Sequence, residues 1–159
     1  MKIYTIGHSN HPLERFLALL EQHSIELIAD VRSQPYSRWV PHFNRQRLAR
    51  ALEAAGVGYV HLSELGGRPR DATLLGPDGQ PDYAKIRASE RFQAGLDRLL
   101  ALATERRTAI MCAEGDYRRC HRHWLIEPAL AQRGVRVLHI QPDGSLAEAH
   151  EEPEQLRLW

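Results

Sequence analysis

The sequence predicts an α/β protein, a three-layer, Rossmann-like sandwich around a mainly parallel sheet of about five strands. Short β-prone runs alternate along the chain with segments whose apolar residues have helical spacing, which is the pattern of consecutive βαβ units. The chain of 159 residues fits one domain and is long enough to bury a core without metal or disulfide support. We expect that core over about residues 2–140, with a C-terminal extension over residues 141–159.

The first half of the chain supplies three strands and two helices. Apolar residues recur at positions i, i+3, i+4 and i+7 from Leu13 and again from Leu48, as on one face of a helix, and Gly56 ends the second pattern. The β-prone runs beside them are short and apolar. The expected elements are, in order, a strand at 2–6, a helix at 13–20, a strand at 26–31, a helix at 48–55 and a strand at 57–62.

A long loop rich in glycine and proline separates these elements from the second half of the chain. There we expect a helix at 92–103, a strand at 108–113, a helix from about 117 to 133 and a strand at 135–140. Pro128 lies inside the second of these helices and predicts a kink. Beyond that strand, Asp143 and Gly144 indicate a turn, and residues 146–159 leave room for a short terminal helix.

The composition excludes several classes of protein. A hydrophobic fraction of 43% and a charged fraction of 26% are typical of a soluble globular chain, not of a disordered, collagen-like or coiled-coil one. No apolar run approaches the roughly 18 residues of a membrane span, so we expect no membrane partner. The N-terminal apolar stretch is too short for a signal peptide. With two cysteines and no export signal, we expect reduced thiols in the cytoplasm.

Arginine outnumbers lysine by 19 to 2. Such a skew is typical of GC-rich coding, and it also supplies planar guanidinium groups that bind anions. Residues 31–52 hold five arginines and no acid, interleaved with aromatic residues such as Tyr36 and Trp39. A loop over residues 32–50 with this composition is able to follow a phosphate backbone and stack on bases. The alternative is that its aromatic residues pack over the sheet while the arginines are solvated.

Polar or reactive residues lie at the end of every predicted strand. In an open parallel sheet the carboxyl ends of the strands meet at one edge, where ligands bind at a topological switch point. We therefore expect these residues to gather there, with the first strand near the centre of the sheet. They are His8 and Ser9 after the first strand, Asp30 and Arg32 at the second, Gly66 and Gly67 after the third, Cys112 and Glu114 at the fourth, and His139 in the fifth.

Several short motifs occur in a fixed order: Thr5-Ile6-Gly7-His8-Ser9, Asp30-Val31-Arg32, Leu65-Gly66-Gly67, Cys112-Ala113-Glu114 and Cys120-His121-Arg122, followed by His139-Ile140 and Asp143-Gly144. With these motifs the chain resembles, from residue 2 to about residue 150, the bacterial and archaeal family called domain of unknown function 488. The Cys-Ala-Glu element followed by Cys-His-Arg is the most specific part of the resemblance. The resemblance implies an α/β fold and marks as signature positions Asp30, Arg32, Cys112, Glu114, Cys120, His121 and Arg122.

The two cysteines admit several interpretations. The segment from Cys112 to Arg118 has the spacing C-x-x-G-x-x-R of cysteine-dependent phosphatases, in which loop amides and an arginine hold phosphate and a helix N-terminus lowers the thiol pKa. Glu114 and Asp116 depart from that pattern because they repel phosphate. We expect Cys112, just before a helix, to be the more reactive thiol and Cys120 to face the core. The alternative is that Cys112 is a buried small hydrophobe.

Metal binding is a further interpretation of the same residues. Cys112, Cys120 and His121 are soft ligands that His8 or His139 would complete. The spacing C-x7-C-H matches no standard zinc motif, and nothing in the sequence requires a cofactor. A disulfide between the two cysteines is expected only as a regulatory event.

The function that we predict is an enzyme acting on an anionic ligand, a phosphate, nucleotide or nucleic acid, at the carboxyl ends of the strands. Asp30 and Glu114 are acid–base candidates, unless they form ion pairs with Arg32 and Arg122 that fasten loops. The alternatives are a non-catalytic nucleic-acid-binding module that uses the loop 32–50 and a metal-binding or redox thiol protein. The predicted catalytic residues are Cys112, Glu114, His8 and Asp30, and the predicted ligand-binding residues are Ser9, Arg32, Gly66, Gly67, Cys120, His121 and Arg122.

Overall fold

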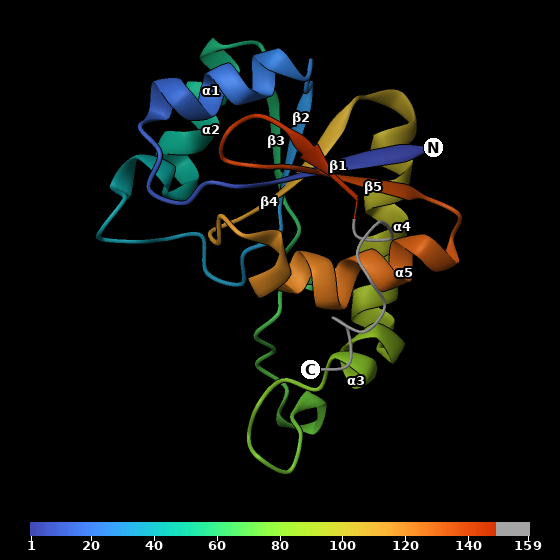
Figure 1. Cartoon of the computed structure of the whole chain (residues 1–159). Coiled ribbons are helices and arrows are strands. Elements are labelled where there is room, and N and C mark those ends of the chain that lie inside the picture. The colour runs from blue at the N-terminus through green and yellow to red at the C-terminus, as the bar shows by residue number, and fades with distance from the viewer. Residues whose placement is uncertain (149–159) are drawn as a thin grey trace.

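A six-stranded sheet with helices on both faces forms the body of the computed structural model, which describes residues 1–148 (Figure 1). The strand order is β3-β2-β4-β1-β5-β6, in which the first five are parallel and β6 is antiparallel to β5. This confirms the predicted α/β class and the mainly parallel sheet, with one short strand more than expected. The strands are β1 (Lys2–Gly7), β2 (Leu27–Asp30), β3 (Gly58–His61), β4 (Thr108–Cys112), β5 (Arg136–Ile140) and β6 (Leu146–Ala147).

Two hydrophobic cores, one on each face of the sheet, give the molecule its three layers. Successive strand residues point to opposite faces, so Ile3 belongs to one core and Tyr4 to the other. β2 and β4 are buried along their whole length, which is why they appear in the sequence as continuous apolar runs. The core around Tyr4 is covered by α1 (Leu13–Gln22) and α2 (Arg45–Ala54), and the core around Ile3 by α3 (Tyr83–Ala88), α4 (Glu90–Glu105) and α5 (Glu127–Gln132) (Figure 1).

The chain leaves neighbouring strands toward opposite faces around β4. β1 and β2 are followed by α1 and α2 on one face, whereas β4 lies between these two strands and leads to α5 on the other face. Such a reversal opens a crevice at the carboxyl ends of the strands. Gly7 is in register with Cys112, and Asp30 with Met111, so the three strands end level with one another. The first strand is central, as expected, and lies between β4 and β5.

The helix predicted from about residue 117 begins later and in a different form. Tyr117–Arg119 make one 3-10 turn, and the continuous helical segment covers residues 121–132. This segment opens as a π-helix at Arg122–Ile126 and goes on as α5. Cys120, with an extended backbone, is therefore the residue that precedes the helical segment rather than a residue within it.

Pro128 explains the π-helical stretch. Proline has no N–H, so the carbonyl group of Trp124, four residues earlier, loses its α-helical partner. Arg87 on α3 donates its Nη1 group to that carbonyl at 2.9 Å and to the carbonyl of Leu125 at 3.3 Å. Before Pro128 the helical segment therefore has a widened turn whose carbonyl groups bind a side chain from another helix.

The terminal helix predicted for 146–159 is wrong in its first residues. Leu146 and Ala147 form β6 beside β5, after a turn in which Gly144 has a φ of +90°. The carbonyl of Ser145 accepts a hydrogen bond from the Gln141 amide at 2.8 Å and closes this turn. The rest of that prediction lies outside the described residues. Within residues 1–148, no helix is both long enough and apolar enough to cross a membrane.

Candidate functional site

A pocket lies at the carboxyl ends of β2 and β4, where the crevice opens. Its volume is about 660 Å³, which is in the range of small-molecule sites. We call it the strand-end pocket. Residues predicted from the sequence that line it are Arg32, Gly67, Cys112, Glu114, Cys120 and His121, and they are joined by Arg68, Arg70, Tyr83 and Arg119.

Two thiol groups face each other in the strand-end pocket. Cys112 is the last residue of β4, and Cys120 follows the 3-10 turn that brings the chain back to it. Their Sγ atoms lie 2.6 Å apart, and both are free cysteines with 2% and 6% of their surface exposed. The sequence spacing alone does not predict this contact, because it depends on the course of the loop between them.

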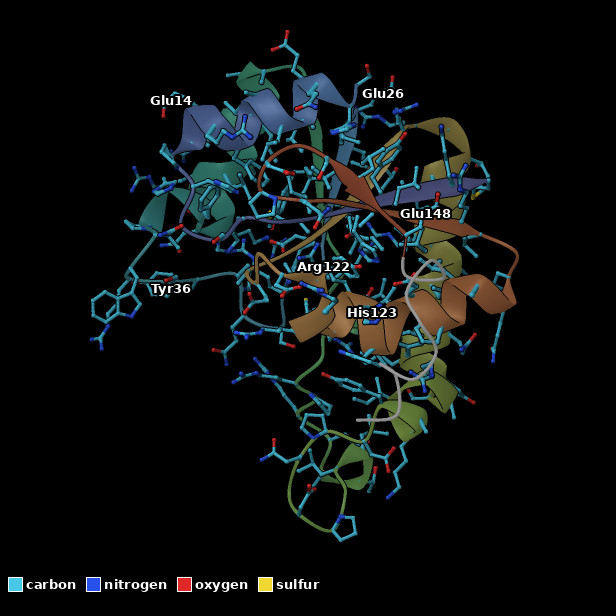
Figure 2. The ribbon with its side chains drawn as sticks, in the orientation of Figure 1. Glu14, Glu26, Tyr36, Arg122, His123 and Glu148 are labelled. Carbon is cyan, nitrogen blue, oxygen red and sulfur yellow. The ribbon has the colours of Figure 1, made fainter. Side chains whose placement is uncertain are left out.

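That loop is held in place by Gly7 and Arg122. A Cβ atom on Gly7 would lie 1.8 Å from the carbonyl oxygen of Glu114, so only glycine lets β1 approach the loop. Arg122 is fully buried at the start of the helical segment (Figure 2). Its Nη2 donates to the Glu114 carbonyl at 2.6 Å, and its Nη1 donates to the Thr5 hydroxyl at 2.9 Å. Arg122 therefore fixes the loop from behind and is not among the lining residues of the pocket.

Cys120 is placed to carry a negative charge. Its Sγ accepts a hydrogen bond from the Arg122 amide at 3.5 Å, as expected for a residue that caps a helical segment. The hydrogen bond from the Cys112 thiol lowers the pKa of Cys120. Burial of the Cys120 thiol opposes this shift, whereas His121 and the charge of Arg122 add to it. Burial and the same hydrogen bond raise the pKa of Cys112. These pKa shifts favour Cys120 as the thiolate, whereas the sequence predicts Cys112 as the more reactive thiol.

His121 has one ring nitrogen available to this thiol. Its Nε2 donates to the carbonyl oxygen of Val31 at 3.1 Å, and its Nδ1 lies 3.6 Å from the Cys120 Sγ. Nδ1 is then the ring atom that faces the thiol as an acceptor, an arrangement in which histidines activate cysteine nucleophiles. Gly67 makes room for the ring, since a Cβ atom there would lie 2.9 Å from the His121 side chain.

A closed network of buried charges lies behind the Arg32 wall of the pocket. Arg32 donates its Nε and Nη2 groups to the two carboxylate oxygens of Asp30 at 2.9 and 2.8 Å. Tyr59 donates its hydroxyl to the same carboxylate at 2.5 Å. Both charged residues are buried, and each oxygen of Asp30 is occupied. This arrangement favours a structural ion pair at Asp30, while Arg32 still contributes to the wall of the pocket.

His8 is held neutral next to this ion pair. Its Nδ1 donates to the Ser9 carbonyl at 2.8 Å, so its Nε2 accepts from Arg32 Nη1 at 3.3 Å. Phe43 stacks on the ring with a centroid distance of 4.6 Å. Burial lowers the pKa of His8 to about 4, and the charge of Arg32 adds to the effect. His8 contacts a wall residue but does not itself line the pocket.

Ser9 and Gly66 lie outside the pocket against its supporting loops. The Ser9 amide donates to the Ala113 carbonyl at 2.9 Å and so joins the end of β1 to the cysteine loop. A Cβ atom on Gly66 would lie 2.4 Å from the Ser33 hydroxyl, which accepts a hydrogen bond from the Arg68 amide at 3.1 Å. Ser9 and Gly66 are therefore in contact with lining residues of the pocket, Ser9 with Ala113 and Gly66 with Ser33.

Three arginines that were not among the predicted site residues give the pocket its charge. Arg68, Arg70 and Arg119 belong to its lining, and none of the three forms an ion pair with a carboxylate within residues 1–148. Glu114 is the acidic side chain of the lining. Nothing in a sequence with 19 arginines marks which of them converge in space.

A chain of hydrogen bonds leads from Arg122 away from the pocket. Thr5 bonds to His139 Nδ1 at 2.6 Å, and both His139 Nε2 and His123 Nδ1 lie 2.8 Å from one oxygen of Glu127. Burial opposes ionisation of Glu127, but the hydrogen bonds from the two histidines lower its pKa to about 2. In the described part of the chain, these histidines and Glu127 are the group whose donor atoms converge closely enough to hold a metal ion. The metal ligands considered from the sequence, Cys112, Cys120 and His121 with His8 or His139, do not form such a group.

These features define an α/β protein with a thiol pair and unpaired arginines at the carboxyl ends of its central strands. The sequence matches the family described as Domain of unknown function DUF488 over residues 12–129, and the chain belongs to that family. The matched span contains every residue that lines the strand-end pocket, whereas β1 and β5 lie outside it. Searches of curated proteins and of solved structures found no match.

Proposed function

We propose that this protein is an enzyme acting on a small anionic substrate in the strand-end pocket, with Cys120 as its nucleophile. The observation that carries the proposal is the position of Cys120, whose pKa is lowered, in the same pocket as Arg68, Arg70 and Arg119. The thiolate is the nucleophilic form of cysteine. Guanidinium groups without carboxylate partners bind carboxylate or phosphate through two parallel hydrogen bonds.

Each wall of the pocket has a separate role in this proposal. The three unpaired arginines hold the anion, and His121 accepts the proton of Cys120 before its Sγ attacks the substrate. Glu114 is exposed at the pocket and is the residue available to exchange protons with the substrate. Arg32 gives a rigid wall, because its charge is balanced by Asp30.

The test compares two alkylating reagents that differ in charge. Iodoacetate is an anion and iodoacetamide is neutral, so the ratio of their rates at Cys120 reports the electric field of the pocket. Peptide mass spectrometry of the full-length protein after brief labelling at pH 7 and low salt measures both rates. Relative to free cysteine, we expect this ratio to favour iodoacetate by about tenfold. Arg68→Gln and Arg119→Gln should each lower it several-fold.

Arg98→Gln is the matched control, because Arg98 is an exposed arginine of α4 that does not line the pocket. Inorganic phosphate and a nucleoside monophosphate are then compared as protectants against labelling. A rate ratio equal to that of free cysteine would refute the anionic substrate. Labelling of Cys120 no faster than that of an ordinary buried thiol would refute its role as nucleophile.

Nucleic-acid binding by the loop over residues 32–50 is a second candidate function. Tyr36 and Trp39 are 73% and 82% exposed, and the Arg38 guanidinium lies 5.1 Å from the Trp39 ring. Figure 2 shows Tyr36 on this loop, and Tyr36 is also one of the residues that line the strand-end pocket. Phe43 is fully buried in a core, so one aromatic residue of the loop packs inward while two are free to stack on bases.

Anisotropy of a labelled single-stranded oligonucleotide, measured over a range of salt concentrations, tests this second function. Binding that weakens steeply with salt would support it. Trp39→Ala should weaken that binding and leave the labelling ratio at Cys120 unchanged, because Trp39 does not line the strand-end pocket. Absence of salt-dependent binding to the wild-type protein would refute a nucleic-acid role for the loop.

A further inference from the structure

We propose that Cys112 and Cys120 act as a dithiol pair that exchanges disulfide bonds with a small disulfide carrying carboxylates. The inference rests on the proposed function for the nucleophile and for the anionic substrate. It adds the reaction and a role for the second cysteine. Three observations support it: the contact between the two sulfurs, their different surroundings and the charge of the surrounding walls.

The two sulfur atoms need little movement to form a bond. They lie 2.6 Å apart, and a disulfide bond is about 2.05 Å long. The backbone on both sides is fixed, because Cys112 ends a buried strand and Arg122 anchors the loop that leads to Cys120. The whole chain has two cysteines, so each is the only partner that the other has for an internal disulfide.

The different surroundings of the two thiols assign an order to them. Cys120 is the more exposed of the pair, accepts hydrogen bonds at the start of the helical segment and has His121 beside it. It is therefore the thiol that attacks from the pocket. Cys112 lies deeper and keeps its proton, which suits a thiol that acts only after its neighbour has reacted.

The exchange consists of two substitutions at sulfur. In the first, the Cys120 thiolate forms a bond to one sulfur of the substrate disulfide, whose S–S bond breaks and releases one thiolate. In the second, the Cys112 sulfur bonds to the Cys120 Sγ, the mixed disulfide breaks, and the second substrate sulfur leaves with the proton of Cys112. The substrate gains two electrons and becomes two thiols, while the cysteine pair loses two and becomes a disulfide. Two external thiols return the pair to its reduced form by the reverse steps and are themselves joined in a disulfide.

The walls of the pocket indicate the kind of disulfide that it accepts. A volume of about 660 Å³ exceeds what a hydroperoxide or another two- or three-atom oxidant would fill. Arg68, Arg70 and Arg119 surround the thiol pair without carboxylate partners in residues 1–148. Carboxylates on the substrate would supply those partners and hold its S–S bond over Cys120.

The experiment uses two disulfides with the same reactive bond and opposite charge. Oxidised glutathione carries carboxylates and a net negative charge, whereas cystamine carries two ammonium groups. The reduced full-length protein is mixed with each, quenched with acid and measured by intact mass spectrometry. With oxidised glutathione we expect the wild-type protein to lose two hydrogens and to keep no adduct. Cys112→Ser should retain one glutathionyl group on Cys120, and Cys120→Ser should not react at a comparable rate.

The rates complete the test. Normalised to free cysteine, oxidised glutathione should react about tenfold faster than cystamine. Arg119→Gln should reduce that preference, and Arg98→Gln should not.

The outcomes separate this inference from the proposed function. A stable glutathionyl adduct on the wild-type protein would overturn the dithiol reaction and leave Cys120 as an accessible nucleophile. If neither disulfide reacts while iodoacetate still labels Cys120 fast, the dithiol reaction is likewise overturned and Cys120 is retained as the nucleophile. An internal disulfide formed equally fast with cystamine would overturn the carboxylate-bearing substrate together with the proposed anionic one. The wild-type mass change needs no variant, so a serine variant that does not fold leaves the test decisive.

Discussion

Acidification from neutral pH to pH 4 should destabilise the protein through His8. The ring is buried, its Nδ1 donates to the Ser9 carbonyl, and its Nε2 accepts from Arg32. A proton on Nε2 would bring a second positive charge into a buried site and set two N–H groups against each other. Burial and the Arg32 charge therefore lower the pKa of His8 from 6.5 to about 4.

The sign and the size of the effect follow from proton linkage. In the unfolded chain His8 takes up a proton as the pH falls through 6.5, whereas in the folded protein it does so only near pH 4. The stability is therefore insensitive to His8 above about pH 7.5 and declines as the pH falls from there to 4. At about 1.4 kcal/mol per unit, the loss is about 2 kcal/mol at pH 5 and about 3 kcal/mol at pH 4.

Urea unfolding of the wild type and of His8→Asn between pH 7.5 and pH 4 measures this loss. Asparagine offers a donor and an acceptor but does not titrate, and other buried groups such as His139 contribute to both proteins alike. The free energy of unfolding should fall by about 3 kcal/mol more in the wild type than in the variant. A parallel decline of the two proteins would refute the reasoning, and so would an NMR titration of the folded His8 ring near pH 6.5.

Three further predictions concern the loop, the interior and the thiols. Gly7→Ala should lower the free energy of unfolding by about 1–3 kcal/mol and slow the alkylation of Cys120, because its Cβ meets the Glu114 carbonyl; an unchanged melting temperature would contradict this. Glu127, with a pKa of about 2 in the folded protein against 4.5 in the unfolded chain, should contribute about 3 kcal/mol above pH 4.5 that is lost as the pH falls to 2. In urea unfolding, the free energy of unfolding of Glu127→Gln should not show that acid-dependent loss. An equal loss in the wild type and in the variant would contradict this role of Glu127. Alkylation of Cys120 by iodoacetamide should keep most of its rate from pH 8 to pH 6, whereas a tenfold fall per pH unit would mark an ordinary thiol.

The parallel strands could be predicted from the sequence because of where they lie. β2 and β4 are inner strands buried on both faces, so their residues form apolar runs that differ from helical spacing. β6 has two residues that pair only with β5, and no local pattern encodes such a strand. α3 buries Ile86 alone and lies next to a loop rich in glycine and proline, so its spacing carries little signal.

The sequence could predict that the strand ends gather at one edge, because the topology of the sheet requires it. It could not predict the contact between the two thiols. Any parallel sheet brings the ends of neighbouring strands to one edge, so Arg32 and Cys112 were expected near each other. The approach of Cys120 to Cys112 depends instead on the loop between them, which Gly7 and Arg122 fix through contacts distant in the sequence. The lowered pKa of Cys120 has the same origin, since its largest cause is the contact with Cys112.

The buried charge of Arg122 connects the thiol pair to the rest of the interior. In residues 1–148 it has no carboxylate within hydrogen-bond distance, and its Nε has no acceptor. A buried cation is costly unless an anion compensates it. The charge of Arg122 helps to lower the pKa of Cys120, and a chain of hydrogen bonds through Thr5 and His139 connects Arg122 to Glu127. Formation of the proposed disulfide would remove the ionisable Cys120 thiol beside Arg122 and leave the hydrogen-bond chain to Glu127 in place.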